Sequence, residues 1–144
     1  MLKGIDPLLS PDLLHIMSSM GHGDTLVIAD ANFPAASVAR RLCRLPGIPA
    51  ARALEAVMSL LPLDTFVDQP VAVMQVVGDP QSVPAPVKDF QAVLSRMTER
   101  SVTFEVVERH AFYERARAAF AVVATGENRP YGNIIVTKGS VRAS

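Results

Sequence analysis

The sequence predicts an α/β fold, a single domain with a central sheet flanked by helices. Amphipathic segments with helical spacing alternate with short, strongly apolar segments along most of the chain, which is the pattern of helices and buried strands. The chain has 144 residues, a suitable length for one domain, and no linker, internal repeat or low-complexity stretch divides it. We therefore expect residues 1–144 to form one domain.

The predicted helices begin and end at recognisable signals. Ser10-Pro11-Asp12 supplies an N-cap hydroxyl, a proline in the first turn and a carboxylate near the positive helix end. This predicts a helix over residues 11–20 that stops at Gly21. Apolar residues at helical spacing predict further helices over residues 48–61, 87–97 and 111–116, with a short helical segment after Pro34.

Short apolar segments supply the predicted strands. They cover residues 26–29, 42–45, 71–77, 103–107, 120–124 and 133–137. The segment 71–77 is apolar apart from Gln75, and continuous rather than alternating hydrophobicity indicates a strand that is covered on both faces. We therefore expect this strand to lie inside the domain.

The composition argues against several classes of function. The chain has 14 basic and 14 acidic residues, and this balance predicts no nucleic-acid and no anionic-membrane partner. No apolar run approaches the ~18 residues of a membrane span, and the first residues lack the long apolar segment of a secretory signal. We therefore expect a cytoplasmic protein. Hydrophobic residues make up 49% of the chain, so we also expect surface to be covered in a homo-oligomer.

Metal and nucleophile chemistry have little support in the sequence. Cys43 is the only cysteine, which excludes an internal disulfide and a multi-cysteine metal site. His22, Asp24 and Asp30 are possible metal ligands, but no second histidine or cysteine lies at metal-binding spacing. No phosphate-binding glycine motif and no nucleophile elbow occurs. A metal site is therefore a weak hypothesis.

The most informative stretch is Met20-Gly21-His22-Gly23-Asp24, which is followed by a short apolar strand and Asp30. Histidine titrates near neutral pH and can both donate and accept a proton. Glycine on either side of it leaves room for a ligand. The alternative is that His22 stabilises the negative end of the first helix, and local features do not decide between the two. The other histidines, His15 and His110, are expected to be structural or exposed.

Polar residues at predicted strand ends and turns are candidates for ligand binding, namely Asp30, Asp64, Arg109, Tyr131 and Asn133. An aspartate after a strand stands where α/β folds place ligand groups, but it can also bond only the backbone amides of the next turn. A partly buried guanidinium needs carboxylate or hydroxyl acceptors, and the alternative for Arg109 is a solvated ion pair with Glu108 or Glu114. The Asn133 amide can donate and accept hydrogen bonds, which suits sugar hydroxyls, although Tyr131-Gly132-Asn133 can also be an ordinary turn.

Several separated motifs occur in order along nearly the whole chain. Besides the stretch from Met20 to Pro34, they are Leu2-Lys3-Gly4, Leu9-Ser10-Pro11, Leu61-Pro62-Leu63-Asp64, Phe112-Tyr113-Glu114-Arg115-Ala116, Ala121-Val122-Val123-Ala124-Thr125-Gly126-Glu127 and Tyr131-Gly132-Asn133. Together they resemble the L-fucose mutarotase / D-ribose pyranase family. The Phe-Tyr-Glu-Arg-Ala segment places the chain nearer the fucose branch, as does Tyr-Gly-Asn, where the pyranase branch tends to have Tyr-Ala-Asn.

The resemblance implies an isomerase that interconverts the α and β anomers of a free monosaccharide without a metal or cofactor. It implies that His22 is the catalytic proton donor and that the five residues Asp30, Asp64, Arg109, Tyr131 and Asn133 bind the sugar. It also implies a ring-shaped homo-oligomer, often a decamer, with pockets near subunit contacts. Two departures concern the identity of the sugar. Arg44-Leu45-Pro46-Gly47 replaces an Arg-Ala-Asp-Gly stretch, and Phe66 stands where tyrosine is common.

These residues suggest a mechanism in which His22 donates a proton to the ring oxygen while the anomeric hydroxyl loses one. The ring opens, the aldehyde turns, and the ring recloses on its other face. General acid–base catalysis supplies roughly 10²–10⁴-fold. In this hypothesis Asp30 holds hydroxyls and orients His22, and the acceptor of the anomeric proton stays open. The alternatives are a non-catalytic monosaccharide-binding protein and a D-ribose pyranase.

Overall fold

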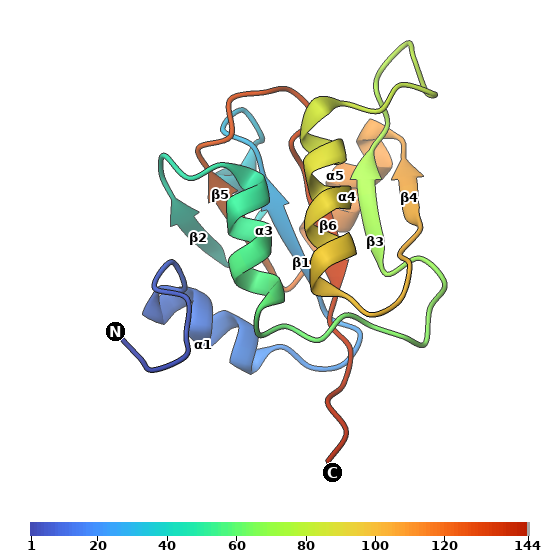
Figure 1. Ribbon diagram of the computed structural model, residues 1–144. Helices are drawn as coiled ribbons and strands as arrows, with labels where there is room; N and C mark the ends of the chain where they lie inside the picture. The colour runs from blue at the N-terminus through green and yellow to red at the C-terminus, as the bar shows by residue number, and fades with distance from the viewer. Residues whose placement is uncertain (144) are drawn as a thin grey trace.

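A mixed sheet of six strands forms the centre of the molecule, in the order β2-β5-β1-β6-β3-β4. The computed structural model describes residues 1–143. The strands are β1 (Thr25–Ala29), β2 (Leu42–Leu45), β3 (Val71–Met74), β4 (Phe104–Val107), β5 (Ala121–Thr125) and β6 (Ile134–Thr137). The helices are α1 (Pro11–Ser19), α2 (Ala35–Val38), α3 (Ala50–Met58), α4 (Ala85–Met97) and α5 (Arg109–Ala118) (Figure 1). The predicted α/β class, with a central sheet flanked by helices, is confirmed.

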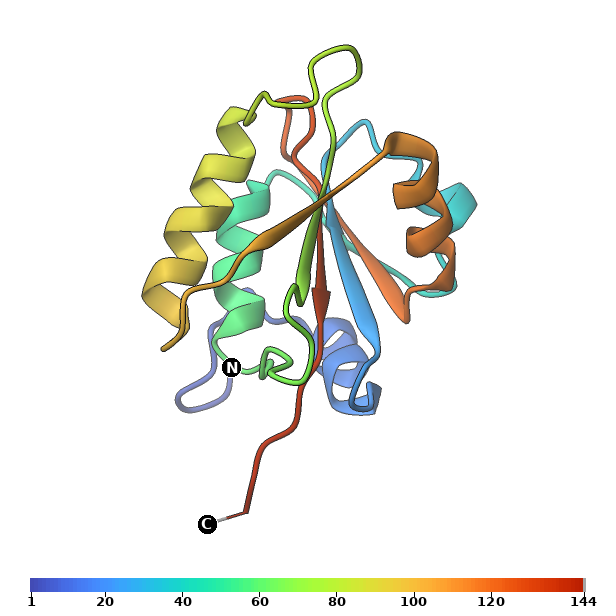
Figure 2. The same ribbon diagram turned by 90° about the vertical axis from the view of Figure 1, so that its right-hand side faces the viewer.

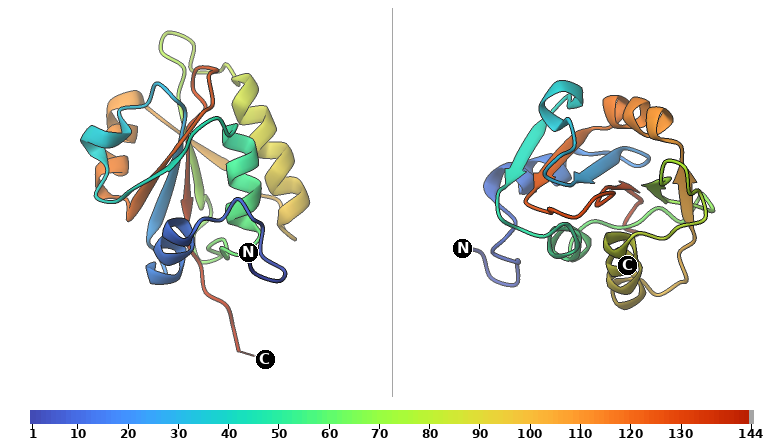
Figure 3. Two further views of the ribbon diagram at one scale, coloured as in Figure 1. Left: turned by 90° about the vertical axis from the view of Figure 1, so that its left-hand side faces the viewer. Right: turned by 90° about the horizontal axis from the view of Figure 1, so that it is seen from above.

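Helices cover both faces of the sheet. Figures 2 and 3 show α3 and α4 side by side on one face and α2 and α5 on the other. Successive residues of β1 point into the two cores, because Val27 packs in the layer of α2 and α5 and Ile28 in the layer of α3 and α4. All four residues of β3 are buried, as continuous hydrophobicity predicted. In the described chain, no helix combines the length and the apolar character that crossing a membrane requires.

The direction of β6 decides which loops meet. β6 runs antiparallel to both of its neighbours, β1 and β3, whereas the other strand pairs of the sheet are parallel. Ile28 pairs with Ile134 and Thr25 pairs with Thr137. The residues that follow β1 therefore lie beside those that precede β6, and the residues that precede β1 lie beside those that follow β6. This strand pair carries polar side chains at both of its ends.

Two predicted elements are too long. The strand predicted over residues 71–77 ends at Met74, because the chain then leaves the sheet and Val77 is exposed. The backbone N–H of Val77 donates instead to the hydroxyl of Tyr131 at 3.0 Å. The helix predicted over residues 48–61 is α3, which starts after Pro49 because that proline occupies the N-cap position.

α5 is longer than predicted, since it starts at Arg109 rather than at Ala111. The reason is the carboxylate of Glu108, which accepts hydrogen bonds from the backbone N–H groups of His110 at 2.9 Å and Ala111 at 3.2 Å. His110 is exposed in the first turn of this helix, in agreement with the structural or exposed role expected for it. The longer helix brings Arg109 to the edge of the sheet where β1 ends.

Candidate active site

Asp30 lies directly after β1 and is buried against the turn that precedes β6. Its carboxylate accepts hydrogen bonds from the backbone N–H of Asn32 at 3.0 Å, the backbone N–H of Gly132 at 3.1 Å and the side-chain amide of Asn133 at 3.1 Å. Burial raises the pKa of Asp30, and these hydrogen bonds offset only part of the rise. The bond from Asn32 is the local turn that was the alternative for this aspartate. The bonds from Gly132 and Asn133 go beyond it, because they come from a distant segment.

The turn before β6 presents Tyr131 and Asn133 at the same place. The side-chain oxygen of Asn133 accepts a hydrogen bond from the backbone N–H of Asp30 at 2.8 Å, so the two residues are connected twice. Tyr131 has a φ of 61°. The left-handed region costs a residue with a side chain roughly 1 kcal/mol, and surrounding contacts must hold it there. The bond from the Val77 amide to the Tyr131 hydroxyl is one such contact.

Four of the predicted sugar-binding residues line one cavity of about 270 Å³, namely Asp30, Arg109, Tyr131 and Asn133. The guanidinium of Arg109 lies 5.9 Å from the ring centroid of Tyr113, which lines the same cavity. Within residues 1–143 Arg109 takes part in no ion pair, so the alternative of a salt bridge with Glu108 or Glu114 is wrong. A wall of hydrogen-bonding groups and aromatic rings suits a small polyhydroxylated ligand.

His22 lies at the opposite end of β1, in a tight loop between α1 and the strand. The backbone N–H of Gly21 donates to the carboxylate of Asp24 at 2.8 Å, which closes the loop. Gly23 has a φ of 88°, a conformation that favours glycine. α1 ends at Ser19, close to the predicted stop. The glycines on both sides of His22 therefore serve the turn that carries the imidazole.

Lys138 occupies the negative end of α1. It directly follows β6, and its ammonium group donates to the carbonyl oxygens of Met17 at 2.8 Å and of Met20. Its backbone also bonds the His22 loop, because the Lys138 carbonyl accepts from the N–H of Gly23 at 2.8 Å. Stabilising the helix end was the alternative role for His22. A lysine fills that role here, and the histidine side chain has a different partner.

The partner of His22 is Asp64, with 3.0 Å between the imidazole Nε2 and a carboxylate oxygen. The imidazole side chain is 45% exposed and the carboxylate side chain only 4%, so a ligand can reach the histidine but not its partner. Burial raises the pKa of Asp64, but hydrogen bonds from the Phe66 amide and the His22 ring together lower it further, and the net shift is downward. Asp64 therefore stays ionised and accepts a hydrogen bond from Nε2–H, which leaves Nδ1 available to a ligand.

The predicted contact between Asp30 and His22 is wrong within one chain, since Asp64 is the residue that orients the imidazole. His22 precedes β1 and Asp30 follows it, and the five residues of this strand extend over roughly 16 Å. The sequence motif places the two residues close together in the chain, but an extended strand separates them in space. Asp64 lies with His22 and not in the cavity of the other four predicted sugar-binding residues.

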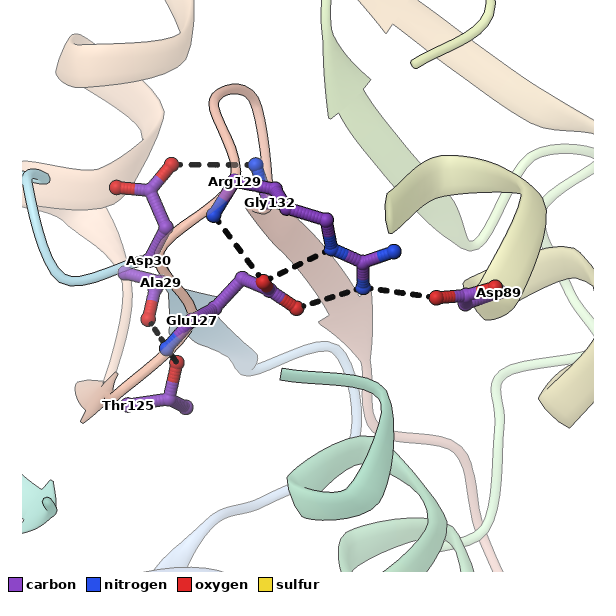
Figure 4. Close-up of polar contacts among 7 residues, drawn as sticks. All are labelled: Ala29, Asp30, Asp89, Thr125, Glu127, Arg129 and Gly132. Carbon is purple, nitrogen blue, oxygen red and sulfur yellow. Dashed lines mark hydrogen bonds and ion pairs between the residues drawn. The ribbon is translucent and has the colours of Figure 1, made fainter. Parts of the chain in front are cut away.

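Sequence reasoning missed a cluster of three charged residues that involves the loop before β6. Arg129 lies between the carboxylates of Glu127 and Asp89, as Figure 4 shows, and Glu127 is buried with only 4% exposure. Glu127 belongs to one of the quoted motifs, but nothing in the motif indicates its partner. Asp89 is on α4 and lies 40 residues before Arg129 in the chain, so no local sequence pattern predicts their contact.

Within residues 1–143, no three histidine, cysteine, aspartate or glutamate side chains come together as possible metal ligands. The described groups suit proton transfer and hydroxyl binding. One end of β1 carries an accessible imidazole on an ionised carboxylate, and the other carries a cavity with amide, carboxylate, guanidinium and phenol groups. The two ends together contain the groups that general acid–base chemistry on a sugar requires.

Comparison with known proteins gives consistent matches over nearly the full chain. An L-fucose mutarotase of Actinobacillus pleuropneumoniae serotype 5b (strain L20) is 45% identical over 139 residues, which cover 96% of each chain. A fucose mutarotase of Homo sapiens is 46% identical over 145 residues, covering 96% of this chain and 93% of that one. The crystal structure of the fucose mutarotase from Streptococcus pneumoniae in complex with L-fucose superimposes with a TM-score of 0.91 at 40% identity, covering 98% of this chain and 100% of that one.

The model of one protein family matches residues 3–141, which is almost the entire sequence. The fold, the motifs and these full-length similarities agree with that match. The chain therefore belongs to the RbsD / FucU transport protein family.

Proposed function

We propose that this protein is an L-fucose mutarotase, which interconverts the α and β anomers of the free sugar. The two relatives described above, named L-fucose mutarotase and fucose mutarotase, are 45% and 46% identical to it over nearly the whole chain. The observation that carries the proposal is the accessible imidazole of His22, held at 3.0 Å by a buried, ionised carboxylate. A protein that only binds a sugar has no need of a titrating group oriented in this way.

The proposed reaction begins when protonated His22 donates from Nδ1 to the ring oxygen. The bond between the anomeric carbon and the ring oxygen breaks, the anomeric hydroxyl passes its proton to water or to a side chain of the neighbouring copy, and an open-chain aldehyde forms. Rotation about the bond next to the aldehyde and reclosure on its other face then give the second anomer. Asp64 holds the imidazole through Nε2 throughout, so the ring stays aligned while it loses and regains its proton. Asp30, Arg109, Tyr131 and Asn133 hold the sugar.

We further propose a ring-shaped homo-oligomer in which each pocket combines His22 and Asp64 of one copy with the cavity of a neighbour. The support is the separation along β1, which a single monosaccharide does not span. Exposed apolar side chains also occur near His22 and near the cavity, which lie at the two ends of β1. Phe66 (69%) and Val67 (43%) follow Asp64, and Val77 (63%) follows β3. Apolar surface of this kind marks contacts between proteins.

Saturation-transfer NMR on equilibrated L-fucose tests the activity directly. Adding the protein should transfer saturation between the two anomeric proton signals, with smaller effects for D-galactose and D-ribose. Saturable binding of L-fucose without exchange would support a non-catalytic binding protein instead. Faster exchange between pyranose and furanose forms of D-ribose than between the anomers of L-fucose would indicate a pyranase.

Subunit mixing tests the shared pocket. His22→Ala and Asp30→Ala chains should each be inactive alone, because every pocket then lacks one group. Equal mixtures, dissociated and reassembled, should regain about a quarter of the wild-type rate, since random assembly pairs an intact His22 with an intact Asp30 in about one pocket in four. No recovery from a mixture that reassembles fully would overturn the shared pocket, and the oligomer size follows from light scattering.

We propose that the reaction requires no metal or cofactor and that the protein acts in the cytoplasm. Opening of a cyclic hemiacetal breaks one carbon–oxygen bond with the help of proton transfers, and an imidazole can supply the proton that the ring oxygen takes up. Dialysis against a chelator should therefore leave the exchange rate of L-fucose anomers unchanged. A rate that falls on dialysis and returns with one added divalent metal would contradict this.

A further inference from the structure

We propose that Arg129 is a positioning residue for the cavity around Asp30, and that it acts through Glu127 and Gly132. What the cavity binds rests on the proposed function, but the positioning itself does not. The loop between β5 and β6 carries Tyr131, Gly132 and Asn133, and a loop that presents ligand-binding groups must be held in one conformation to bind well. The contacts of Arg129 show how this loop is held.

Arg129 bridges two carboxylates from different parts of the fold. Its Nε donates to Glu127 at 3.0 Å, and its Nη2 donates to the other Glu127 oxygen at 2.9 Å and to Asp89 of α4 at 2.8 Å. The backbone N–H of Arg129 also donates to Glu127 at 3.2 Å. Figure 4 shows the guanidinium reaching from the loop to α4. The arginine therefore ties the loop to a helix that packs on the sheet.

Glu127 connects this ion pair to both sides of Asp30. Its backbone carbonyl accepts a hydrogen bond from the N–H of Ala31 at 2.8 Å, directly after Asp30. Its backbone N–H donates to the hydroxyl of Thr125 at 3.2 Å, and that hydroxyl donates to the carbonyl of Ala29 at 2.7 Å, directly before Asp30. A shift of Glu127 is therefore transmitted to the backbone on either side of the cavity aspartate.

Gly132 provides the second connection. A β-carbon at this position would lie 2.6 Å from Cγ of Glu127 and 3.3 Å from Cβ of Asp30, so the glycine packs between the two side chains. The N–H of Gly132 donates to the Asp30 carboxylate at 3.1 Å. The Glu127 side chain therefore forms part of the surface against which the donor to Asp30 packs.

The charge of Glu127 makes Arg129 necessary. The guanidinium lowers the pKa of this carboxyl group by hydrogen bonding and charge, against the opposing effect of burial. Without Arg129, a carboxylate with 4% exposure would lack a counter-charge and would have to move toward water or take up a proton. Either change alters the Glu127 side chain against which Gly132 packs. Arg129 therefore sets the geometry of the cavity without lining it.

The central experiment compares Arg129→Ala with Arg52→Ala. Arg52 on α3 is a matched control, because its guanidinium also bridges two carboxylates, Asp6 at 2.8 Å and Glu55 at 3.8 Å. The side chains of Arg52 and Arg129 are similarly exposed, at 42% and 40%. Arg129→Ala should raise KM for L-fucose roughly 10- to 100-fold and change kcat much less, because His22 and Asp64 lie at the other end of β1. Arg52→Ala should leave both constants within about twofold. Equal changes in the two variants, or a loss confined to kcat, would overturn the proposal.

Amide hydrogen exchange tests the positioning without reference to activity. In Arg129→Ala the amides of Ala31 and Gly132 should exchange at least about tenfold faster, while the β1 amides Val27 and Ile28 keep their protection. Unchanged protection of Ala31 and Gly132 would overturn the proposal even if KM rose. If instead the wild-type protein catalyses no exchange of L-fucose anomers, the proposed function fails, and the amide result still decides the role of Arg129.

Two further variants guard against a failure to fold. Asp89→Asn keeps the ion pair of Arg129 with Glu127 and should raise KM and speed amide exchange less than Arg129→Ala does. Arg129→Lys should reverse part of the increase in KM.

Gly132→Ala tests the path from Arg129 to Asp30. It should raise KM in the wild-type background, since Arg129 prevents Glu127 from moving aside. In the Arg129→Ala background the same substitution should cost at least about threefold less. Equal penalties in the two backgrounds would show that Arg129 does not act through Glu127 and Gly132.

Discussion

The two ends of β1 carry buried aspartates that look alike but behave differently. Asp30 and Asp64 are exposed by only 5% and 3%, and each accepts a hydrogen bond from the backbone N–H two residues further on. Yet the pKa of Asp30 is raised and the pKa of Asp64 is lowered. The main difference is burial, which raises the pKa of Asp30 by more than its hydrogen bonds from Asn32, Gly132 and Asn133 lower it. At Asp64 the hydrogen bonds from the Phe66 amide and the His22 ring, with the charge that this ring can carry, outweigh burial.

In the proposed mechanism, the Asp30 end recognises the sugar and the Asp64 end transfers the proton. At the Asp30 end, hydrogen bonds join the Asp30 carboxyl group to Gly132 and Asn133 at the cavity. Substituting one partner there leaves the other buried polar group without a hydrogen bond. At the Asp64 end, the carboxylate holds an imidazole that a ligand can reach. Changes at the first end should therefore affect stability and binding, and changes at the second should affect the rate of the reaction.

His22→Ala should have the largest effect. The rate of L-fucose anomer exchange should fall roughly 10²–10⁴-fold, because the acid–base group is lost. Binding of the sugar and the free energy of unfolding should change little, since the side chain is 45% exposed. Saturation-transfer NMR measures the rate and calorimetry measures the binding. His15→Ala, which removes another exposed histidine, is the control and should match the wild type. A variant that retains the wild-type rate would rule out His22 as the proton donor.

Asn133→Ala should have the next largest effect, and on different quantities. It removes the acceptor of the Asp30 backbone N–H and a donor to the Asp30 carboxylate, both of them buried. We expect about 1–3 kcal/mol less stability in urea denaturation and weaker sugar binding. Asn128→Ala, an exposed position in the same loop, should change neither. A stable Asn133→Ala protein with normal affinity would contradict the division between the two ends.

Asp64→Asn should change the pH dependence of stability. A lowered pKa in the folded state means that Asp64 contributes stability above its unfolded pKa of about 3.9 and that this contribution is lost as pH falls through the folded value. The wild type should therefore exceed Asp64→Asn by about 1 kcal/mol at pH 7, with the difference disappearing in acid below about pH 4. Urea denaturation between about pH 2 and pH 7 measures this.

Asp30→Asn serves as the comparison in the same urea denaturation series. The pKa of Asp30 is shifted upward, which is opposite to the shift of Asp64. Ionising this carboxyl group costs stability, so the wild type should lose stability relative to Asp30→Asn as pH rises through the folded pKa of Asp30. If the stability difference between wild type and variant changed with pH in the same direction for Asp30→Asn and Asp64→Asn, the two aspartates would not differ as described.

Phe66→Ala should have the smallest effect. The Phe66 ring lies 5.1 Å from the His22 ring, centroid to centroid, but is 69% exposed. We expect less than about 0.5 kcal/mol of change in the free energy of unfolding of the separated chain, as for other exposed positions. Val67→Ala is the neighbouring control. A large loss of oligomer in Phe66→Ala alone would identify the ring as part of the contact between copies.

The class of fold and most of the elements follow from local patterns in the chain. Periodicity located the helices and strands, and the apolar run after Pro70 correctly indicated a strand buried on both faces. The errors fall at element ends, where a tertiary contact competes with the local signal. The Val77 amide donates to the Tyr131 hydroxyl rather than to a neighbouring strand. The Glu108 carboxylate caps α5, so this helix begins at Arg109. Motifs also named the candidate site residues, whose roles in catalysis stay predictions.

The grouping of these residues in space depends on contacts between distant parts of the chain. The antiparallel pairing of β1 with β6 brings Asn133 to Asp30 and Lys138 to the His22 loop, and strand direction leaves no mark in the hydrophobic pattern. The same holds for His22 with Asp64 and for Arg129 with Asp89, which lie 42 and 40 residues apart. Local propensity extends over a few residues, whereas these contacts form only when the sheet closes. The proposed proton donor His22 and the cavity residue Asp30, which are close in the sequence, are therefore separated by the length of an extended strand.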